Sequence, residues 1–290
     1  MKYKKYHVEN DFIIKEELPV SAIHEIEVDI LRTFVNFCDE NGLRYFLAGG
    51  TLIGAVRHQG FIPWDDDMDV SMPRKDFERF RELTMDGKLG DYQIRSIIHT
   101  PEIHARPFDR LVDNRYMAKV KVEQPFIPPW LDIHALDGLP TDPIENSKHW
   151  DKVNELKRGS KLSRTPLKPF KKGGIKRVLK TIRHYKMYKK GPLYYAEKMN
   201  ELGRTYDFDS SDYIAAFMAG YGRKERMPRY YYTDGEKKLY FEGVLCSVPP
   251  HYNLVLKHMY GNPLQLPAVS NRVTHIERLW EVVPKEVKKN

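Results

Sequence analysis

The sequence predicts an α+β fold, with a mixed sheet flanked by helices and one helical, basic insertion. Short apolar or alternating runs, typical of strands, are interspersed with longer runs in which apolar residues recur every three or four positions, as in helices. A chain of 290 residues with 41% hydrophobic and 30% charged residues suits one large domain or two small ones, neither disordered nor fibrous. The patterns allow an α+β or an α/β domain, and we expect the α+β form.

The N-terminal elements have clear signatures. Residues 20–40 predict an amphipathic helix, because apolar residues recur at helical spacing: Ile23, Ile26, Ile30, Phe34 and Phe37. The next elements are expected as strands at 45–48 and 67–72, a short helix at 52–58 and a charged helix at 74–83. Thr51 is a suitable N-cap for the short helix.

The later elements divide the chain into three parts. Strands are expected at 92–98, 108–112, 117–122, 130–135, 213–218 and 238–248, and a helix at 251–260. The segment 147–202 is helical in pattern, with breaks near 166–174 and at Gly191-Pro192. We therefore expect a catalytic core over 1–146, a basic helical insertion over 147–202, and a C-terminal part over 203–290 that completes the core.

The net charge of +8 is concentrated in one segment. Residues 157–190 contain 14 Lys or Arg and no Asp or Glu, so the rest of the chain carries −6. Inside this segment, apolar residues recur at helical spacing, with basic residues between them: Ile175, Val178, Leu179, Ile182 and Tyr185. A basic amphipathic helix is typical of a membrane surface. The alternative is a helix that packs its apolar face on the core, and no nucleic-acid partner is expected, because no known nucleic-acid motif accompanies the charge.

Composition also indicates in which cellular compartment the protein is expected. The two cysteines, Cys38 and Cys246, lie in apolar runs, which argues against a disulfide scaffold or a cysteine-based zinc site and favours a reducing, cytoplasmic location. No stretch approaches the ~18 apolar residues of a membrane span. Residues 1–7 are basic but lack the apolar core of a secretory signal, so none is expected.

The most informative stretch holds four carboxylates, at Asp65, Asp66, Asp67 and Asp69. Bringing them together without a cation costs several kcal/mol at low effective dielectric. In a strand, Asp67 and Asp69 share a face, Asp65 reaches it where the strand extends that far, and Asp66 faces away. Adjacent carboxylates suit Mg²⁺ or Mn²⁺, which hold phosphates. An acidic turn ahead of a strand is the alternative.

Two features near the aspartates favour a phosphate site. Gly49-Gly50-Thr51 lies between a predicted strand and helix, where glycine lets backbone N–H groups approach a phosphate closely. Arg57 and His58 close the same helix and supply a cation between the glycines and the aspartates. Taken alone, these features also suit a tight turn and a helix-end charge.

A third carboxylate follows on a later strand. Asp132 is flanked by Leu131 and Ile133, and a charge in such an apolar context needs a partner. Three roles would explain the charge: Asp132 is a third metal ligand, it is a general base, or it forms a structural hydrogen bond. Strand, Gly-Gly, helix, spaced aspartates and a later carboxylate together indicate a nucleotidyltransferase-type site for phosphoryl transfer, with Asp132 suited to take a proton from the attacking hydroxyl.

These motifs resemble a known family. The run from Tyr45 to His58, followed by 60–70 and Met72-Pro73-Arg74, closely resembles the LicD family, the lipopolysaccharide cholinephosphotransferase group that shares its core with fukutin-related protein. The resemblance continues at Trp130-Leu131-Asp132-Ile133, Asp137-Gly138-Leu139-Pro140, Phe241-Glu242-Gly243, Val248-Pro249, Tyr260-Gly261, Leu266-Pro267 and His275. It spans roughly 20–145 and 235–276, and the middle segment shows no match.

The resemblance implies a nucleotidyltransferase fold, Mg²⁺ or Mn²⁺, and a CDP-activated alcohol such as CDP-choline as donor. The phosphoalcohol passes to a sugar hydroxyl of a lipid-linked, cell-surface glycan precursor, of the lipopolysaccharide or teichoic acid kind, and CMP leaves. The implied metal ligands are Asp65, Asp67, Asp69 and Asp132. The implied donor contacts are Gly49, Gly50, Thr51 and His58, with Arg57 as a catalytic helper.

Several assignments stay open. His134 stands where the family leads one to expect an aromatic residue such as Phe, and it either joins the site or is a buried histidine bonded to its neighbour. Glu242 and His275 lie in matching motifs without an assigned role. An aromatic cage from Tyr230–Tyr232 or Tyr194-Tyr195 would favour choline, whereas glycerol, ribitol and ethanolamine phosphate remain open donors.

Two other functions are compatible with the same residues. One is a nucleotidyltransferase that uses an NTP and releases pyrophosphate. The other is a non-catalytic protein that binds a membrane or an anion through 157–190. For the leading function we expect a cytoplasmic enzyme that contacts the inner membrane face through the same segment.

Overall fold

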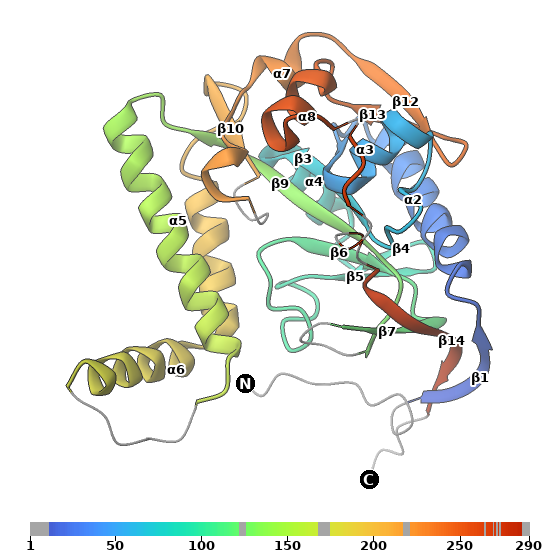
Figure 1. Cartoon of the computed structure of the whole chain (residues 1–290), viewed down its shortest axis with the longest axis horizontal. Coiled ribbons are helices and arrows are strands. Elements are labelled where there is room, and N and C mark those ends of the chain that lie inside the picture. Colours follow the sequence, from blue (N-terminus) through green and yellow to red (C-terminus); the bar gives the residue numbers. More distant parts are fainter. Residues whose placement is uncertain are drawn as a thin grey trace.

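The computed structural model describes residues 12–121, 126–167, 175–216, 221–263, 265–268, 270, 272 and 274–285. Helices pack on a mixed sheet (Figure 1), so the mixed α+β class is confirmed. The N-terminal residues 1–7 and most of the expected helix break at 166–174 lie outside the described residues.

The main sheet is built around β9 (Trp130–Leu139), which is buried along its whole length. It pairs in parallel with β3 (Met68–Pro73) and antiparallel with β6 (Asp109–Val112) and β10 (Tyr213–Ala215). The other strands are β2 (Phe46–Leu47), β4 (Lys88–Leu89), β5 (Tyr92–Arg95) and β11 (Met227–Pro228). The β3–β9 register places Asp69 beside Asp132, which brings two distant motifs together.

Four helices cover this sheet and the site: α2 (Ala22–Glu40), α3 (Gly49–His58), α4 (Arg74–Leu83) and α8 (Tyr252–Tyr260). The apolar stripe that predicted α2 is buried at Ile23, Ile30 and Phe34. One expectation is corrected, because α3 begins at Gly49 and Thr51 does not cap it. The Thr51 hydroxyl instead accepts a hydrogen bond from the Asp69 backbone N–H at 2.9 Å.

A second sheet has the order β1-β14-β7-β8, with β1 (Phe12–Leu18), β7 (Tyr116–Val120), β8 (Phe126–Ile127) and β14 (Ile276–Pro284). The sequence did not predict β1 or β14. Most of β1 is exposed, and its hydrophobic pattern is weak. A hairpin of β12 (Lys237–Phe241) and β13 (Val244–Val248) completes the strands.

The basic segment forms two helices, α5 (Pro143–Arg164) and α6 (Ile175–Gly203). Helix α6 is interrupted at Gly191, whose φ of 78° and ψ of 163° are not helical, and Pro192 follows. The residues before the break, 175–190, form an α6 arm that runs away from the body (Figure 1). The three-part division of the chain stays a prediction.

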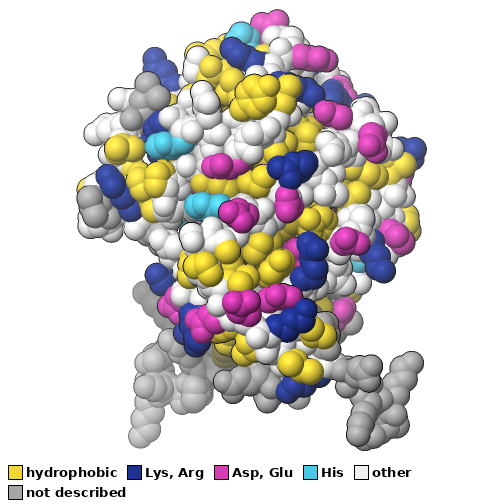
Figure 2. Space-filling view, turned by 90° about the vertical axis from the view of Figure 1, so that its right-hand side faces the viewer, with side chains coloured by type: hydrophobic (Ala, Val, Ile, Leu, Met, Phe, Trp, Pro, Cys, Tyr) yellow, Lys and Arg dark blue, Asp and Glu magenta, His cyan; other side chains and the backbone are white. Residues whose placement is uncertain are grey.

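Two surface findings bear on location. No helix in the described part of the chain is long and apolar enough to cross a membrane. On the face shown in Figure 2, acidic and basic side chains are interspersed among hydrophobic ones, without a large patch of one sign.

Candidate active site

A cavity of about 310 Å³ lies between α3, β3, β9 and α8. The residues on one side are polar or glycine: Gly49, Gly50, Asp65, Asp67, Asp69, Ser71, His134 and His275. The sequence-predicted glycines and three of the four predicted carboxylates therefore meet in one cavity. The fourth, Asp132, does not line it.

One group of metal-capable side chains comes from the β3–β9 pair. Asp69, Asp132 and His134 offer ligand atoms within 4.8 Å of one another. His134 Nε2 lies 3.1 Å from Asp69 Oδ1, so His134 is bonded to a neighbour and also lines the cavity. Arg110, opposite Asp132 on β6, donates to both of its carboxylate oxygens at 2.5 and 2.7 Å. Asp132 thus has the structural partner that its buried charge required.

A second group consists of Asp65, Asp67 and His275, again within 4.8 Å. Asp67 precedes β3, so it and Asp69 belong to different groups of one cavity rather than to one run of strand. His275 is brought in by Asp66, which accepts hydrogen bonds from the backbone N–H groups of His275 (2.8 Å) and Ile276 (2.6 Å). His275 Nδ1 lies 2.9 Å from Asp66 Oδ1, which leaves Nε2 for a metal. Asp66 faces away from the cavity, as predicted.

The carboxylates repel one another. Burial, reinforced by Asp66 and Asp69, raises the pKa of Asp65 to about 6. Burial, Asp69 and Asp65 raise the pKa of Asp67 to about 8. The hydrogen bond to Asp66, opposed by burial and aided by Asp67, raises the pKa of His275 to about 9. A cation is the group that would relieve this repulsion, and carboxylate and imidazole ligands fit Mg²⁺ or, better, Mn²⁺.

The two glycines make room for the carboxylates. A methyl group on Gly49 would lie 2.9 Å from Asp69 Oδ2, and one on Gly50 would overlap Asp65 Oδ2. Gly49 also has a φ of +55°, which disfavours other residues. Because these glycines form the first turn of α3, their N–H groups and the helix dipole favour negative charge at this point.

Three other predicted residues lie outside the cavity. Thr51 is buried, and its hydroxyl accepts a hydrogen bond from the Asp69 backbone N–H. Arg57 donates to His58 Nε2 at 2.9 Å and to the Pro263 carbonyl at 3.1 Å, and its guanidinium faces the Trp64 ring. The geometry therefore does not place Arg57 and His58 among the residues lining the cavity.

Sequence reasoning missed two buried acids near the site. Glu27 lies on α2 with no solvent exposure, and burial together with Asp67 raises its pKa well above the usual range. Glu225 lines the cavity at 4% exposure. Of the two, only Glu27 could have been noticed in the sequence, because it is a charged residue within the apolar stripe of its helix. Nothing in the sequence around Glu225 distinguishes it.

The structure shows where the motif residues without an assigned role lie. Glu242 accepts a hydrogen bond from the Phe61 backbone N–H at 3.1 Å and fills the space beside Gly60, so it holds a loop. Of Tyr230–Tyr232, only Tyr232 lines the cavity. Tyr194 and Tyr195 lie in a separate cleft between α5 and α6.

Comparison with known proteins agrees with this geometry. Residues 42–173 match a family model described as LicD/FKTN/FKRP, nucleotidyltransferase domain. The chain is 28% identical over 252 residues to the lipopolysaccharide cholinephosphotransferase LicD of Haemophilus influenzae, which covers 86% of this chain and 92% of that protein. It is 40% identical over 52 residues to the human ribitol 5-phosphate transferase FKRP, or 18% of this chain and 10% of that one. Residues 42–173 therefore match the LicD/FKTN/FKRP nucleotidyltransferase domain, and the similarity to LicD extends over most of the chain.

Proposed function

We propose that the protein is a metal-dependent LicD-type phosphotransferase. It would move a phosphoalcohol, phosphocholine or a similar group, from a CDP-activated donor to a sugar hydroxyl of a lipid-linked glycan precursor, with release of CMP. The observation that carries the proposal is the meeting of Asp67 and Asp69 with Gly49 and Gly50 in one cavity. The match of residues 42–173 to the LicD/FKTN/FKRP domain and the similarity of the chain to a cholinephosphotransferase support it.

The chain's own groups would orient the donor. The N–H groups of Gly49 and Gly50, at the start of α3, would hold phosphate oxygens next to the carboxylates. Asp65, Asp67 and Asp69, with His275, would bind the cation, and Mg²⁺ or Mn²⁺ held there would neutralise charge that develops on the donor phosphates. His134, bonded to Asp69, would fix the orientation of that carboxylate.

Asp132 has a different role in this proposal from the one suggested by the motif alone. Both of its oxygens accept hydrogen bonds from Arg110, and its side chain does not line the cavity. Taking up a proton would leave the Arg110 charge facing a neutral acid in a buried setting. We therefore assign Asp132 to positioning, beside Asp69, and not to proton transfer.

The test is a panel of CDP-alcohols with Mg²⁺ or Mn²⁺, with CMP as the measured product. We expect turnover only with metal, and near-complete loss in Asp67→Asn and in Asp69→Asn. Mn²⁺ binding measured by calorimetry gives a second readout, and it should fall with activity. Asp91→Asn, at an exposed turn, is the control and should behave as wild type. Full activity in either site variant would overturn the proposal.

The same assay separates the other functions. Pyrophosphate formed from an NTP, with no CMP from any CDP-alcohol, would identify a nucleotidyltransferase. Salt-dependent anion or membrane binding that survives loss of the aspartates, with no turnover, would identify a non-catalytic binder. The cytoplasmic location belongs to the proposal as well, and the free, buried Cys38 and Cys246 are compatible with it.

A further inference from the structure

The cavity changes character away from the aspartates. Its other side is lined by apolar and aromatic side chains, with Glu225 as their acidic neighbour: Leu52, Leu136, Ala216, Tyr221, Met227, Tyr232, Val255, Leu256, Met259 and Tyr260. Glu225 ends a short 3-10 helix, η1 (Gly222–Glu225), that contacts α8. A buried carboxylate in an apolar chamber carries a large desolvation cost, so its presence there needs a reason.

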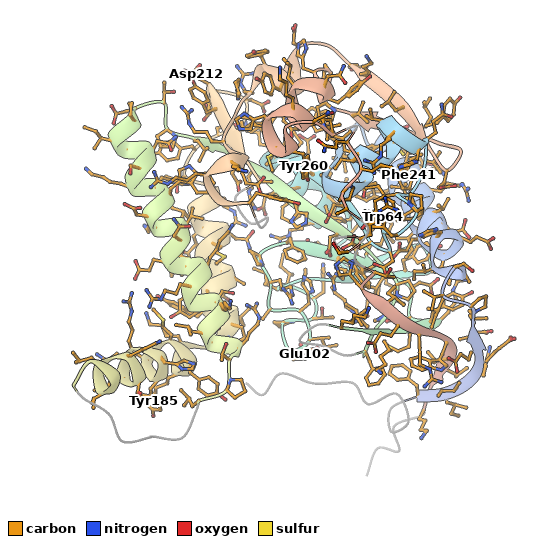
Figure 3. The ribbon with its side chains drawn as sticks, viewed as in Figure 1. Trp64, Glu102, Tyr185, Asp212, Phe241 and Tyr260 are labelled. Atoms are coloured by element: carbon orange, nitrogen blue, oxygen red, sulfur yellow. The ribbon has the colours of Figure 1, made fainter. Side chains whose placement is uncertain are left out.

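Three tyrosines line the same cavity as this carboxylate. The rings of Tyr221 and Tyr260 meet edge to face at 5.6 Å, with their hydroxyl oxygens 3.5 Å apart. Tyr260 is the last residue of α8 and lies in the upper part of the view in Figure 3. Tyr232, Tyr260 and Glu225 line one side of the same cavity, and burial raises the pKa of both tyrosines. The Tyr221 backbone N–H donates to Glu225 Oε1 at 3.1 Å and fixes the carboxylate.

We propose that Tyr221, Glu225, Tyr232 and Tyr260 form a chamber for a quaternary ammonium group, so that this enzyme selects a cationic phosphoalcohol donor. The inference rests on the proposed function, because the chamber opens into the same cavity as the carboxylates. Aromatic faces and a carboxylate attract such a cation, and its methyl groups need no hydrogen-bond partners in an apolar lining. A donor phosphate at Gly49 and Gly50 would thereby extend its alcohol toward Glu225.

The charges facing Glu225 leave room for a ligand cation. Lys157 and His134 act favourably on the Glu225 carboxylate, and Asp69 acts against it. Burial nevertheless raises the pKa of Glu225 to about 7, so the existing positive charges do not offset its desolvation.

A polyol would fit this chamber poorly. Glycerol and ribitol carry hydroxyls that need partners. The apolar side chains of Leu52, Met227 and Val255 offer none, which leaves only the Glu225 carboxylate and the tyrosine hydroxyls to serve them. Buried hydroxyls without partners cost about 1–3 kcal/mol each. A primary ammonium has three donors, of which one carboxylate satisfies only part. We therefore expect the preference order choline, then ethanolamine, then glycerol and ribitol.

The experiment compares kcat/KM for CMP release from CDP-choline, CDP-ethanolamine and CDP-glycerol. We expect Glu225→Gln, which keeps the shape and removes the charge, to lower kcat/KM for CDP-choline at least tenfold and to leave CDP-glycerol within twofold. Tyr221→Phe should retain the choline preference, and Tyr221→Leu should lose it several-fold, because Tyr221 is half exposed and its loss spares the core. The exposed Glu277→Gln is the matched control.

The outcomes separate this inference from the proposed function. Equal use of CDP-glycerol and CDP-choline by the wild type, or an equal loss for all donors in Glu225→Gln, would overturn the chamber and leave the phosphotransferase intact. If no donor yields CMP, the proposed function fails. Calorimetry with phosphocholine against glycerol phosphate, in Mg²⁺, then decides whether the chamber still prefers the cation, and equal or absent binding would overturn it.

A second, independent observation concerns the α6 arm. Four large apolar side chains are exposed along it at helical spacing: Leu179 (61%), Ile182 (46%), Tyr185 (53%) and Tyr188 (44%). Exposed basic residues flank them: Lys180, Arg183, Lys186, Lys189 and Lys190. The arm contacts α5 through the buried Met187 and through His184, whose Nε2 lies 3.1 Å from the carbonyls of Leu162 and Thr165. Among the residues whose side chains are described, Leu179, Ile182 and Tyr185 of the apolar stripe are therefore exposed, which favours the membrane interpretation over packing on the core.

We infer that the α6 arm lies on an anionic lipid surface. The stripe combines exposed apolar and tyrosine side chains with cations and no carboxylate between 157 and 190, which is complementary to anionic headgroups. Each Lys or Arg near such a surface contributes about 1 kcal/mol at low salt. The break at Gly191 lets the arm project from the rest of α6, and Tyr185 on it lies far from Tyr260 in the view of Figure 3.

The test is co-sedimentation of the full chain with vesicles of phosphatidylcholine alone or with 30% phosphatidylglycerol. We expect binding only to the anionic vesicles, weakened at high salt, and lost at least tenfold in a Leu179→Ser/Ile182→Ser/Tyr185→Ser variant. Met85→Ser/Ile144→Ser removes equally exposed apolar groups elsewhere and should bind as wild type. Unchanged binding of the arm variant, absent vesicle binding, or tighter binding to RNA than to vesicles would overturn the inference.

Discussion

His275 Nδ1 lies 2.9 Å from Oδ1 of Asp66, although the two residues are more than 200 positions apart. The same carboxylate accepts hydrogen bonds from two backbone N–H groups at the start of β14. Asp66 is 2% exposed, and its pKa is lowered because these hydrogen bonds outweigh the opposing effect of burial. The acidic loop is thus fastened to the C-terminal strand by the one aspartate that does not face the cavity.

The first prediction concerns this link. Asp66→Asn keeps the shape but presents one oxygen to three donors, so we expect a loss of about 3 kcal/mol in the free energy of unfolding. The pKa of His275 should fall from about 9 toward 6.5, since its hydrogen-bonded partner is neutral. NMR titration of the histidine ring measures this shift. Asp234→Asn removes a similar bond to the surface His251 and should cost little. An unchanged His275 pKa would contradict the prediction.

Removal of metal should change how stability depends on pH. The pKa values of Asp65 and Asp67 are raised in the folded protein to about 6 and 8, so folding takes up protons above pH 4. The raised pKa of His275 gives stability that is present below pH 6.5 and lost as pH rises through 9. All three effects have the same sign: in EDTA, the melting temperature should fall from pH 6.5 to pH 9.

Two comparisons check that interpretation. Saturating Mg²⁺ should flatten the decline, because the cation stabilises the ionised carboxylates. Asp67→Asn in EDTA should also flatten it, since the group with the most strongly raised carboxyl pKa is gone. A melting temperature that rises over this range in EDTA would show that the carboxylates do not repel one another as the geometry implies.

The glycines of α3 give a steric prediction. Gly50→Ala would push a methyl group into the Asp65 carboxylate, so we expect Mn²⁺ affinity and CMP release to fall at least tenfold. Gly49→Ala should be worse, because it adds a strained φ to the contact with Asp69. Gly243→Ala shares the positive φ but meets nothing within 4 Å, and should lose only about 1 kcal/mol of stability with metal binding intact. Calorimetry and thermal melts separate these effects.

Local sequence patterns predicted much of the fold and of this site. The apolar stripe of α2, the alternation of β3 and the Gly-Gly turn are each decided by neighbours in the chain, so spacing was enough to place them. The two-residue period of extended chain predicted that Asp66 faces away from its neighbours, and it does so although these aspartates precede β3. The partners of Asp132 could not be read in this way, because Arg110 reaches it through strand pairing.

The parts that sequence missed depend on long-range pairing. Strand β1 is largely exposed and is held by β14 from the other end of the chain, including a Lys15–Glu281 ion pair at 2.7 Å. Glu225 becomes notable only because folding buries it beside the tyrosines. Arg57 is a different case: its place in the motif predicted a helper of the phosphate contacts, which stays a prediction, and its guanidinium faces the Trp64 ring.

The last prediction separates catalysis from stability at Asp132. Asp132→Asn should lower activity and also cost about 3–5 kcal/mol, because Arg110 would remain buried without its partner. Adding Arg110→Met removes the unpaired charge, so the double variant should recover much of the stability, measured by denaturant unfolding, while CMP release stays low. Asp69→Asn, whose carboxylate faces the cavity, should lose activity with a smaller change in stability. If the double variant were as unstable as Asp132→Asn, then Asp132 would not stabilise the fold through its ion pair with Arg110. If it recovered activity as well, Asp132 would have no part in positioning the site.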